Sequence, residues 1–189
     1  MSDSTLGLAQ LLDREQIRDC LARLARGEDR RNAELIADSY WPDAVIDLGI
    51  FIGTYEQYVN WVVPGSPDIA ATQHVLGQSL IDLHGETALV ETQVLAYHRV
   101  GTPDGQCDSV IGGRYLDRMD HIGGTWRIAR RTMIYDWYQE FGQSVDWAAD
   151  GLMGLRLDTA NYTGRAVQDP SEAFLGDGWS VDEVGGSAE

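Results

Sequence analysis

The 189-residue sequence has little cysteine and no long apolar run, and each absence argues against a class of protein. Its two cysteines, Cys20 and Cys107, belong to no CxxC pair and to no cysteine and histidine cluster at metal-ligand spacing. We therefore expect both thiols to be reduced and structural. No apolar run approaches the roughly 18 residues that span a bilayer, and the first residues lack the basic and apolar regions of a signal peptide. These features predict a cytoplasmic protein.

Positive charge is also scarce. Fourteen Lys and Arg residues stand against 30 Asp and Glu residues, which gives a formal net charge of −16. Such a charge repels phosphate backbones and anionic lipid headgroups, so we expect neither nucleic acid nor a membrane as a partner. The sequence also lacks a glycine-rich phosphate loop, a GxSxG elbow and an HExxH motif, which argues against the enzyme classes built on them.

The composition that remains is that of a globular protein, with 43% hydrophobic and 23% charged residues. A chain of this length suits one domain with a sizeable core plus an appendage. We place the domain at residues 1–140, because the apolar pattern weakens from Glu140 onward into an acidic, glycine-rich mixture. Residues 141–189 are then expected to form a C-terminal extension, partly ordered against the domain by apolar side chains.

Helical signals come first along the chain. Apolar residues recur at three- and four-residue spacing over residues 8–24, and Asp13-Arg-Glu-Gln16 has the form of a capping box. We therefore expect this region in two pieces, with a helix that starts at Asp13 and stops at Gly27. Asn32 can cap a second helix, and Thr54-Tyr-Glu-Gln57 repeats the capping-box pattern before a third.

Strand signals follow. We expect a short strand over Ala44–Leu48 and four long ones over Ala71–Leu83, Glu86–Val100, Cys107–Met119 and Thr125–Asp136. Helices first and strands afterwards favour an α+β fold, in which the helices cover one face of a bent antiparallel sheet. Both parities of the last strand carry apolar residues, so the second face of the sheet is expected to meet another subunit. This pattern predicts a homo-oligomer.

His74 is the strongest candidate for chemistry. It lies in Thr72-Gln-His-Val-Leu-Gly77, a mostly apolar, β-prone run. A histidine on a half-buried strand can act as a general base near neutral pH if a carboxylate fixes its tautomer and stabilises the imidazolium. Asp29 is the candidate carboxylate, because it follows the expected helix end at Gly27. The alternative is a packed histidine bonded to the backbone, the commoner fate of a lone histidine on an apolar strand.

His98 ends one parity of the expected strand Glu86–Val100, after a series of small apolar residues. If that parity faces inward, His98 shares a cavity with His74, and the alternative is a surface position at the strand end. Two histidines and Asp29 have the residue types of a metal site. They are also what a cofactor-free acid–base site needs, so we expect neither a metal nor a cofactor.

The order of these elements and several short sequence motifs resemble those of the SnoaL-like branch of the NTF2-like superfamily. The resemblance covers residues 8–138. The segment Thr72–Gly77 is similar to the one that carries the catalytic histidine of scytalone dehydratase, a member of that branch. Along the next strand, the second histidine of that enzyme falls on His98. The acid of its catalytic His/Asp pair falls on Asp29.

The last two strands carry a second resemblance. Ile111-Gly-Gly-Arg-Tyr-Leu-Asp117 and Trp126-Arg-Ile-Ala-Arg-Arg-Thr132 are similar to the last hairpin of hexachlorocyclohexane dehydrochlorinase, another member, whose pocket arginine falls on Arg131. A surface salt bridge is the alternative for Arg131 in so acidic a protein. The family implies a cone-shaped α+β barrel around an apolar cavity, often as a trimer. The residues predicted to form the cavity wall or contact the substrate are His98, Trp41, Phe51, Tyr58, Trp61, Leu48 and Arg114.

The residues that would recognise the substrate depart from both relatives. Where scytalone dehydratase has two tyrosines that hold the reacting water, this chain has Glu28 and Leu48. Its polar pocket residues on the third long strand fall on Val110 and Gly112, and the lysine of the dehydrochlorinase falls on Leu24. The resemblance therefore supports neither enzyme's substrate.

Together these features predict a cofactor-independent lyase that carries out a dehydratase-type elimination on a small hydrophobic molecule. His74 would take a C–H proton, Asp29 would orient it, and Arg131 or His98 would stabilise the developing negative charge. The alternatives are an isomerase or polyketide-cyclase-type enzyme on the same fold, a non-catalytic protein that binds a hydrophobic ligand, and an accessory subunit of another enzyme. We expect a homotrimer, with a dimer as the second choice.

Overall fold

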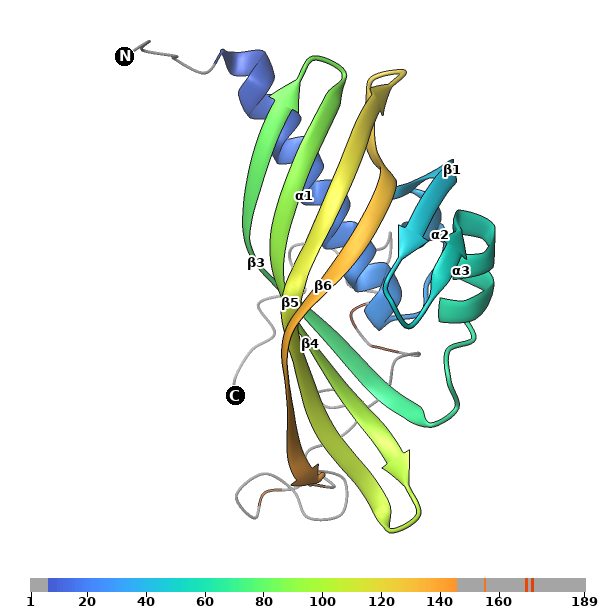
Figure 1. Cartoon of the computed structure of the whole chain (residues 1–189). Helices are drawn as coiled ribbons and strands as arrows, with labels where there is room; N and C mark the ends of the chain where they lie inside the picture. The colour runs from blue at the N-terminus through green and yellow to red at the C-terminus, as the bar shows by residue number, and fades with distance from the viewer. Residues whose placement is uncertain (1–6, 146–154, 156–168, 170, 172–189) are drawn as a thin grey trace, which may run out of the picture. The chain divides into compact units, whose positions relative to one another are not determined.

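A computed structural model of the chain describes residues 7–145, 155, 169 and 171 (Figure 1). Contacts divide the chain into two units, Met1–Ser144 and Val145–Glu189, and the fold and site below belong to the first. Most of the predicted C-terminal extension, residues 141–189, lies outside the described residues. The elements of the first unit are α1 (Leu8–Asp29), α2 (Ala33–Ala37), β1 (Tyr40–Asp47), β2 (Ile52–Thr54), α3 (Tyr55–Val62), β3 (Ile69–His84), β4 (Thr87–Thr102), β5 (Gly105–Ile122) and β6 (Thr125–Gln143).

Helix α1 is one continuous helix, so the predicted break at Asp13 and the stop at Gly27 are both wrong. The Asp13 carboxylate does not cap a helix; it accepts a hydrogen bond from the indole N–H of Trp126, at 3.0 Å. Gly27 is a close-approach position, because a Cβ there would lie 3.0 Å from side-chain atoms of Leu35 and Ile36 on α2. The helix therefore continues through Gly27 and ends at Asp29.

The two short helices begin where the sequence predicts. The Asn32 side chain accepts hydrogen bonds from the main-chain N–H groups at the start of α2, and Thr54 and Gln57 form a complete capping box at the start of α3. Between the end of α1 and the start of α2, Arg31 has a φ of +50°, which turns the chain sharply. This turn leads into α2, and both α2 and α3 lie beside β1 (Figure 1).

The six strands form one curved sheet in the order β2-β1-β6-β5-β4-β3. The four long strands are antiparallel neighbours, as predicted, whereas β1 pairs with β6 in parallel, for which the sequence carried no signal. Helix α1 runs along one face of this sheet and contacts β3 and β6 (Figure 1). The predicted α+β class is confirmed, and the described sheet is open, with β2 and β3 as its edges.

The long strands bend sharply near their middle. The pairing of β3 with β4 shifts between Leu76 and Ser79, and the pairing of β5 with β6 shifts between Gly112 and Gly113. A Cβ on Gly113 would lie 2.3 Å from the carbonyl oxygen of Ile134, so only glycine fits at that crossing. The bend leaves a hollow on the inner face of the sheet, next to the C-terminal end of α1.

The main core lies between α1 and the inner face of the sheet. Its largest fully buried side chains include Trp126, Tyr40, Ile17 and Leu24. The outer face of the long strands is different, because leucines alternate there with charged side chains and remain exposed, up to 74% for Leu80. No helix among the described residues is long and apolar enough to cross a membrane.

Candidate active site

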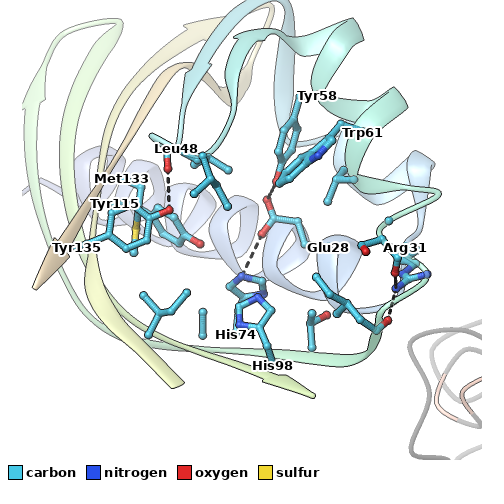
Figure 2. Close-up of a pocket in the computed structure, with 18 residues that line it drawn as sticks. Glu28, Arg31, Leu48, Tyr58, Trp61, His74, His98, Tyr115, Met133 and Tyr135 are labelled. Atoms are coloured by element: carbon cyan, nitrogen blue, oxygen red, sulfur yellow. Dashed lines mark hydrogen bonds and ion pairs between the residues drawn. The ribbon is translucent and has the colours of Figure 1, made fainter. Parts of the chain in front are cut away.

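A cavity of about 170 Å³ lies in the hollow of the bent sheet, below α3 (Figure 2). Helices α1 and α3, the loop between β1 and β2, and all four long strands contribute side chains to it. Most of the lining is aliphatic or aromatic, with a few polar groups. The residues that line it are Glu28, Arg31, Leu48, Ile50, Tyr58, Trp61, Val62, Gly65, Ser66, Ile69, Thr72, His74, Ala96, His98, Ile111, Tyr115, Met133 and Tyr135.

His74 and Asp29 are in direct contact, although 45 residues separate them in the sequence. His74 Nδ1 lies 2.7 Å from Asp29 Oδ1, and the main-chain N–H of His74 donates to both carboxylate oxygens at 3.0 Å. Asp29 reaches the strand because it is the last residue of α1, where the helix meets β3. The prediction had placed Asp29 just outside a helix end, and the structure places it inside one.

This contact fixes the orientation of the imidazole. An ionised carboxylate can only accept hydrogen bonds, so His74 Nδ1 carries the proton in the pair with Asp29. The other ring nitrogen, Nε2, then points away from Asp29 into the cavity (Figure 2). A neutral His74 therefore presents an unprotonated nitrogen to any molecule in the cavity.

The charges around His74 favour its protonated form. Burial lowers the pKa of His74, but the hydrogen bond to Asp29 and the negative charges of Glu28 and Asp29 outweigh that effect. The net result is a pKa raised above the ordinary value of 6.5. The imidazolium that would form after proton abstraction is thus stabilised by its surroundings.

Glu28 is the second acidic group of the site, and its part was not predicted. Its side chain is only 5% exposed, and Oε2 lies 3.9 Å from His74 Nε2. The other oxygen, Oε1, accepts a hydrogen bond of 2.5 Å from the hydroxyl of Tyr58 on α3. The sequence showed Glu28 only as the replacement of a tyrosine of scytalone dehydratase. No local signal marked it as a cavity residue, because the helix was expected to stop at Gly27 and instead continues through Glu28.

His98 lies in the same cavity as His74. The two rings meet edge to face with 6.3 Å between their centroids, because His74 pairs with Ala96 and Thr72 pairs with His98 across β3 and β4. Burial lowers the pKa of His98, and the neighbouring His74 lowers it further. Its Nδ1 is buried with no hydrogen-bond partner among the residues described. Burial and the neighbouring His74 thus both favour the neutral form of the His98 ring.

Three of the predicted wall residues line the cavity, namely Leu48, Tyr58 and Trp61. Phe51 lies behind them, stacked on Trp61 with 5.1 Å between ring centroids. Trp41 lies elsewhere, where its indole N–H donates to the carbonyl of Asp120. Phe51 and Trp41 are thus not among the lining residues.

Neither predicted arginine lines the cavity. Arg131 is 3% exposed and makes two hydrogen bonds of 2.8 Å to Asp117, while its guanidinium lies 3.9 Å from the ring centroid of Tyr115. Arg114 lies at the protein surface and pairs with Asp136. Asp117 lies 14 residues before Arg131 and on the neighbouring strand, so no local sequence pattern indicated that the two would pair.

The cavity contains polar residues that the sequence did not single out. Arg31 donates to the carbonyl oxygens of Pro64, Ser66 and Ile69 at one end of the cavity, and so ties the end of α1 to the start of β3. At the other end, Tyr135 donates to the carbonyl of Leu48 (Figure 2). In the part of the chain that the structure describes, no group of three or more His, Cys, Asp or Glu residues is arranged to hold a metal ion.

Comparison with known proteins identifies a domain family. The family model described as "SnoaL-like domain" matches residues 9–132 of this chain. The uncharacterised protein Rv2910c of Mycobacterium tuberculosis (strain ATCC 25618 / H37Rv) is 28% identical over 132 residues, which cover 68% of this chain and 88% of that protein.

Solved structures share the fold at lower identity. Hexachlorocyclohexane dehydrochlorinase LinA-type3 from Novosphingobium barchaimii LL02 superposes with a TM-score of 0.64 and 19% identity, covering 74% of this chain and 98% of that one. A scytalone dehydratase-like protein from Novosphingobium aromaticivorans DSM 12444 gives a TM-score of 0.59 and 20% identity, covering 71% and 91%. The predicted NTF2-like fold is thereby confirmed.

Proposed function

The chain belongs to the SnoaL-like domain family, and from that premise we propose that it is a cofactor-independent lyase that removes water from a small hydrophobic molecule. The observation that carries this proposal is the 2.7 Å contact between His74 Nδ1 and Asp29, which leaves Nε2 facing a largely apolar cavity. A positioned base of this kind typically contributes about 10²–10⁴ in rate.

In the proposed reaction, His74 Nε2 takes a proton from a carbon next to a carbonyl group of the substrate. The electron pair of that C–H bond forms an enolate, and Asp29 stabilises the resulting imidazolium. The enolate then expels a hydroxyl group from the next carbon, and the proton on His74 passes to that hydroxyl to give water. His74 returns to its neutral form, so the cycle needs no other reagent.

The size of the cavity limits the substrate. An engineered cavity of about 150 Å³ lined by apolar residues holds one benzene molecule, and the cavity here measures about 170 Å³. Its apolar walls include Leu48, Ile111 and Met133. The substrate class that fits is therefore a single six-membered ring with small substituents, with larger groups extending through the opening.

The solved relatives support an elimination. One is named a dehydrochlorinase and another is named for scytalone dehydratase, and both names describe the loss of a small molecule from the substrate. An isomerase or cyclase would use the same base, and a binding protein would use the same cavity without the base.

A test uses 3-hydroxycyclohexanone, a one-ring ketone whose dehydration is followed by enone absorbance. We expect turnover by the wild-type protein, and a decrease of about 10²–10⁴ in kcat/KM for His74→Ala and for Asp29→Asn. His84→Ala and Asp82→Asn are matched controls, because His84 and Asp82 form an exposed pair of the same type. If both site variants stayed within a few-fold of wild type, the His74–Asp29 proposal would be wrong.

Deuterium exchange separates the alternatives. In D₂O, cyclohexanone has exchangeable C–H groups but no hydroxyl to lose, so a working base exchanges them without elimination. His74-dependent exchange without dehydration of any hydroxylated probe would indicate an isomerase or cyclase. Binding of cyclohexanone with no accelerated exchange would indicate a non-catalytic binding protein.

We also propose a homo-oligomer, a trimer by preference, formed through the outer face of the sheet. Leu80, Leu89 and Leu116 are exposed there, and the strand register places Glu91 and Arg118 between them. Such a face can match a second copy in both apolar and charged groups. Light scattering should give a multiple of 20.9 kDa for the wild type and a lower mass for Leu89→Asp. The control Leu8→Asp changes an exposed leucine of α1 and should leave the mass unchanged.

A further inference from the structure

We propose that Glu28 holds the leaving group of the substrate, and that it selects a hydroxyl group over a halide. This inference deepens the proposed function, because it assigns the second carboxylate of the same cavity. It concerns binding as well as turnover, so it can fail or hold independently of the elimination itself.

The separation between Glu28 and His74 is the first observation. Oε2 and Nε2 are 3.9 Å apart, too far for a direct hydrogen bond. A single oxygen atom about 2.8 Å from each of them would complete a triangle with an angle of about 90° at that oxygen. One hydroxyl group therefore fits between the two once His74 has taken up a proton: it donates to Glu28 Oε2 and accepts from the Nε2–H of the imidazolium.

The fixed position of the carboxylate is the second observation. Glu28 Oε1 is occupied by the Tyr58 hydroxyl at 2.5 Å, which leaves Oε2 as the oxygen turned toward His74 (Figure 2). The Tyr58 ring is itself 2% exposed and packs against the rings of Tyr40 and Phe51. Glu28 is thus held in place by the core rather than left free to rotate.

The charge of the site gives the selectivity. Two carboxylates, Glu28 and Asp29, flank His74, while the nearby cation Arg131 is paired with Asp117. A hydroxyl group can donate to a carboxylate, whereas a chlorine atom has no proton to donate and leaves as an anion, which Glu28 would repel. The site therefore favours loss of water and disfavours loss of chloride. A carboxylate or phosphate at this position of a substrate would be repelled for the same reason.

The test compares two unreactive ligands of similar size, cyclohexanol and chlorocyclohexane. Their dissociation constants are measured by calorimetry for wild type, for Glu28→Gln and for the control Glu86→Gln, which changes an exposed glutamate that pairs with His121. A hydrogen bond to a charged group corresponds to about tenfold or more in affinity. We expect the preference for cyclohexanol to fall by about that factor in Glu28→Gln and to stay unchanged in Glu86→Gln.

A second measurement needs no variant. In ¹⁵N NMR of the wild type, at a pH below the His74 ionisation, cyclohexanol should shift the His74 Nε2 resonance and leave the Nδ1 resonance in place, because Nδ1 is bonded to Asp29. Chlorocyclohexane should shift neither. An unshifted Nε2 resonance at saturating cyclohexanol, or an unchanged preference in folded Glu28→Gln, would overturn the inference.

The results also separate this inference from the proposed function. A Glu28-dependent preference for cyclohexanol in a protein that does not dehydrate 3-hydroxycyclohexanone would leave the inference standing and remove the lyase. Dehydration that depends on His74 but proceeds equally in Glu28→Gln would do the opposite.

Discussion

Two buried pairs of a carboxylate with a basic side chain, Arg131–Asp117 and His74–Asp29, are built differently. Arg131 and Asp117 meet through two parallel hydrogen bonds of 2.8 Å, with side chains 3% and 0% exposed. His74 and Asp29 meet through one ring nitrogen, and the other nitrogen faces the cavity. In the Arg131–Asp117 pair both carboxylate oxygens accept hydrogen bonds from the guanidinium, whereas the His74–Asp29 pair leaves the Nε2 atom of His74 available to a substrate.

The balance of charge differs in the same way. Arg131 has one carboxylate partner, and the negative charge of Asp117 helps raise the pKa of the guanidinium even though burial opposes it. His74 has two carboxylates nearby, since Glu28 approaches its free nitrogen. In a matched buried pair the loss of either partner leaves an uncompensated charge, whereas a pair with one carboxylate in excess stabilises the imidazolium that a base forms.

The largest effect should come from breaking the matched pair. In Asp117→Ala the Arg131 guanidinium stays buried without its partner, and we expect the free energy of unfolding to fall by about 3–5 kcal/mol. Urea denaturation followed by tryptophan fluorescence measures this. The control Asp136→Ala removes an exposed pair with Arg114 and should cost about 0–1 kcal/mol.

A double variant makes this prediction sharper. Asp117→Leu combined with Arg131→Met removes both charges and keeps apolar volume, and such replacements are often neutral or stabilising. We expect it to recover most of the lost stability. If the double variant were as unstable as Asp117→Ala, the pair would matter through packing around Tyr115 rather than through charge.

Changing the open pair should affect turnover more than stability. His74→Asn keeps an amide N–H near the position of Nδ1, where it can donate to Asp29, and removes the base at Nε2. We expect kcat/KM for 3-hydroxycyclohexanone to fall by about 10²–10⁴, with a loss of about 1–3 kcal/mol in unfolding free energy. His84→Asn is the control for an exposed histidine. Wild-type turnover in His74→Asn would assign the base to another residue.

Local signals in the sequence predicted much of the fold, because each rests on contacts a few residues apart. The caps at Asn32 and Thr54 and the long antiparallel strands are of this kind. The predictions of a helix start at Asp13 and a helix stop at Gly27 were wrong, because both residues contact distant parts of the chain. The indole of Trp126 donates to Asp13, and α2 packs on Gly27. The parallel pairing of β1 with β6 likewise depends on residues far apart in the chain.

The site was predicted unevenly for the same reason. Asp29 was predicted as the partner of His74 from the expected helix end at Gly27, and the family resemblance pointed to the same pair across 45 residues. The helix in fact continues to Asp29, so the pairing was predicted correctly but the local reason for it was wrong. The resemblance of the last hairpin to the dehydrochlorinase suggested a cavity role for Arg131, but the guanidinium of Arg131 is instead paired with Asp117 on the neighbouring strand. The sequence marked Glu28 only as the replacement of a tyrosine of scytalone dehydratase. Its role as a carboxylate depends on its contacts with Tyr58 and His74, which are distant in the sequence.

The smallest predicted effect is a shift in pH dependence. The base must be neutral to act, and the pKa of His74 is raised above 6.5: burial alone would lower it, but the hydrogen bond to Asp29 and the charges of Glu28 and Asp29 prevail. We therefore expect kcat/KM to rise with pH through an ionisation above 6.5. The sign for stability is opposite, because the pair contributes fully below the unfolded pKa of about 6.5 and loses that contribution as pH rises through the folded value.

Variants of the two carboxylates test the cause of this shift. Asp29→Asn removes the first of the groups that raise the pKa and should move the ionisation to lower pH, and Glu28→Gln should move it in the same direction. Titration of the His74 ring by ¹³C NMR measures this without any substrate, and the pH–rate profile measures it with one. Asp82→Asn, beside the exposed His84, is the control and should leave the His74 titration unchanged. A rate profile that stays flat from about pH 5 to 9, with proton transfer rate-limiting, would exclude His74 as the base.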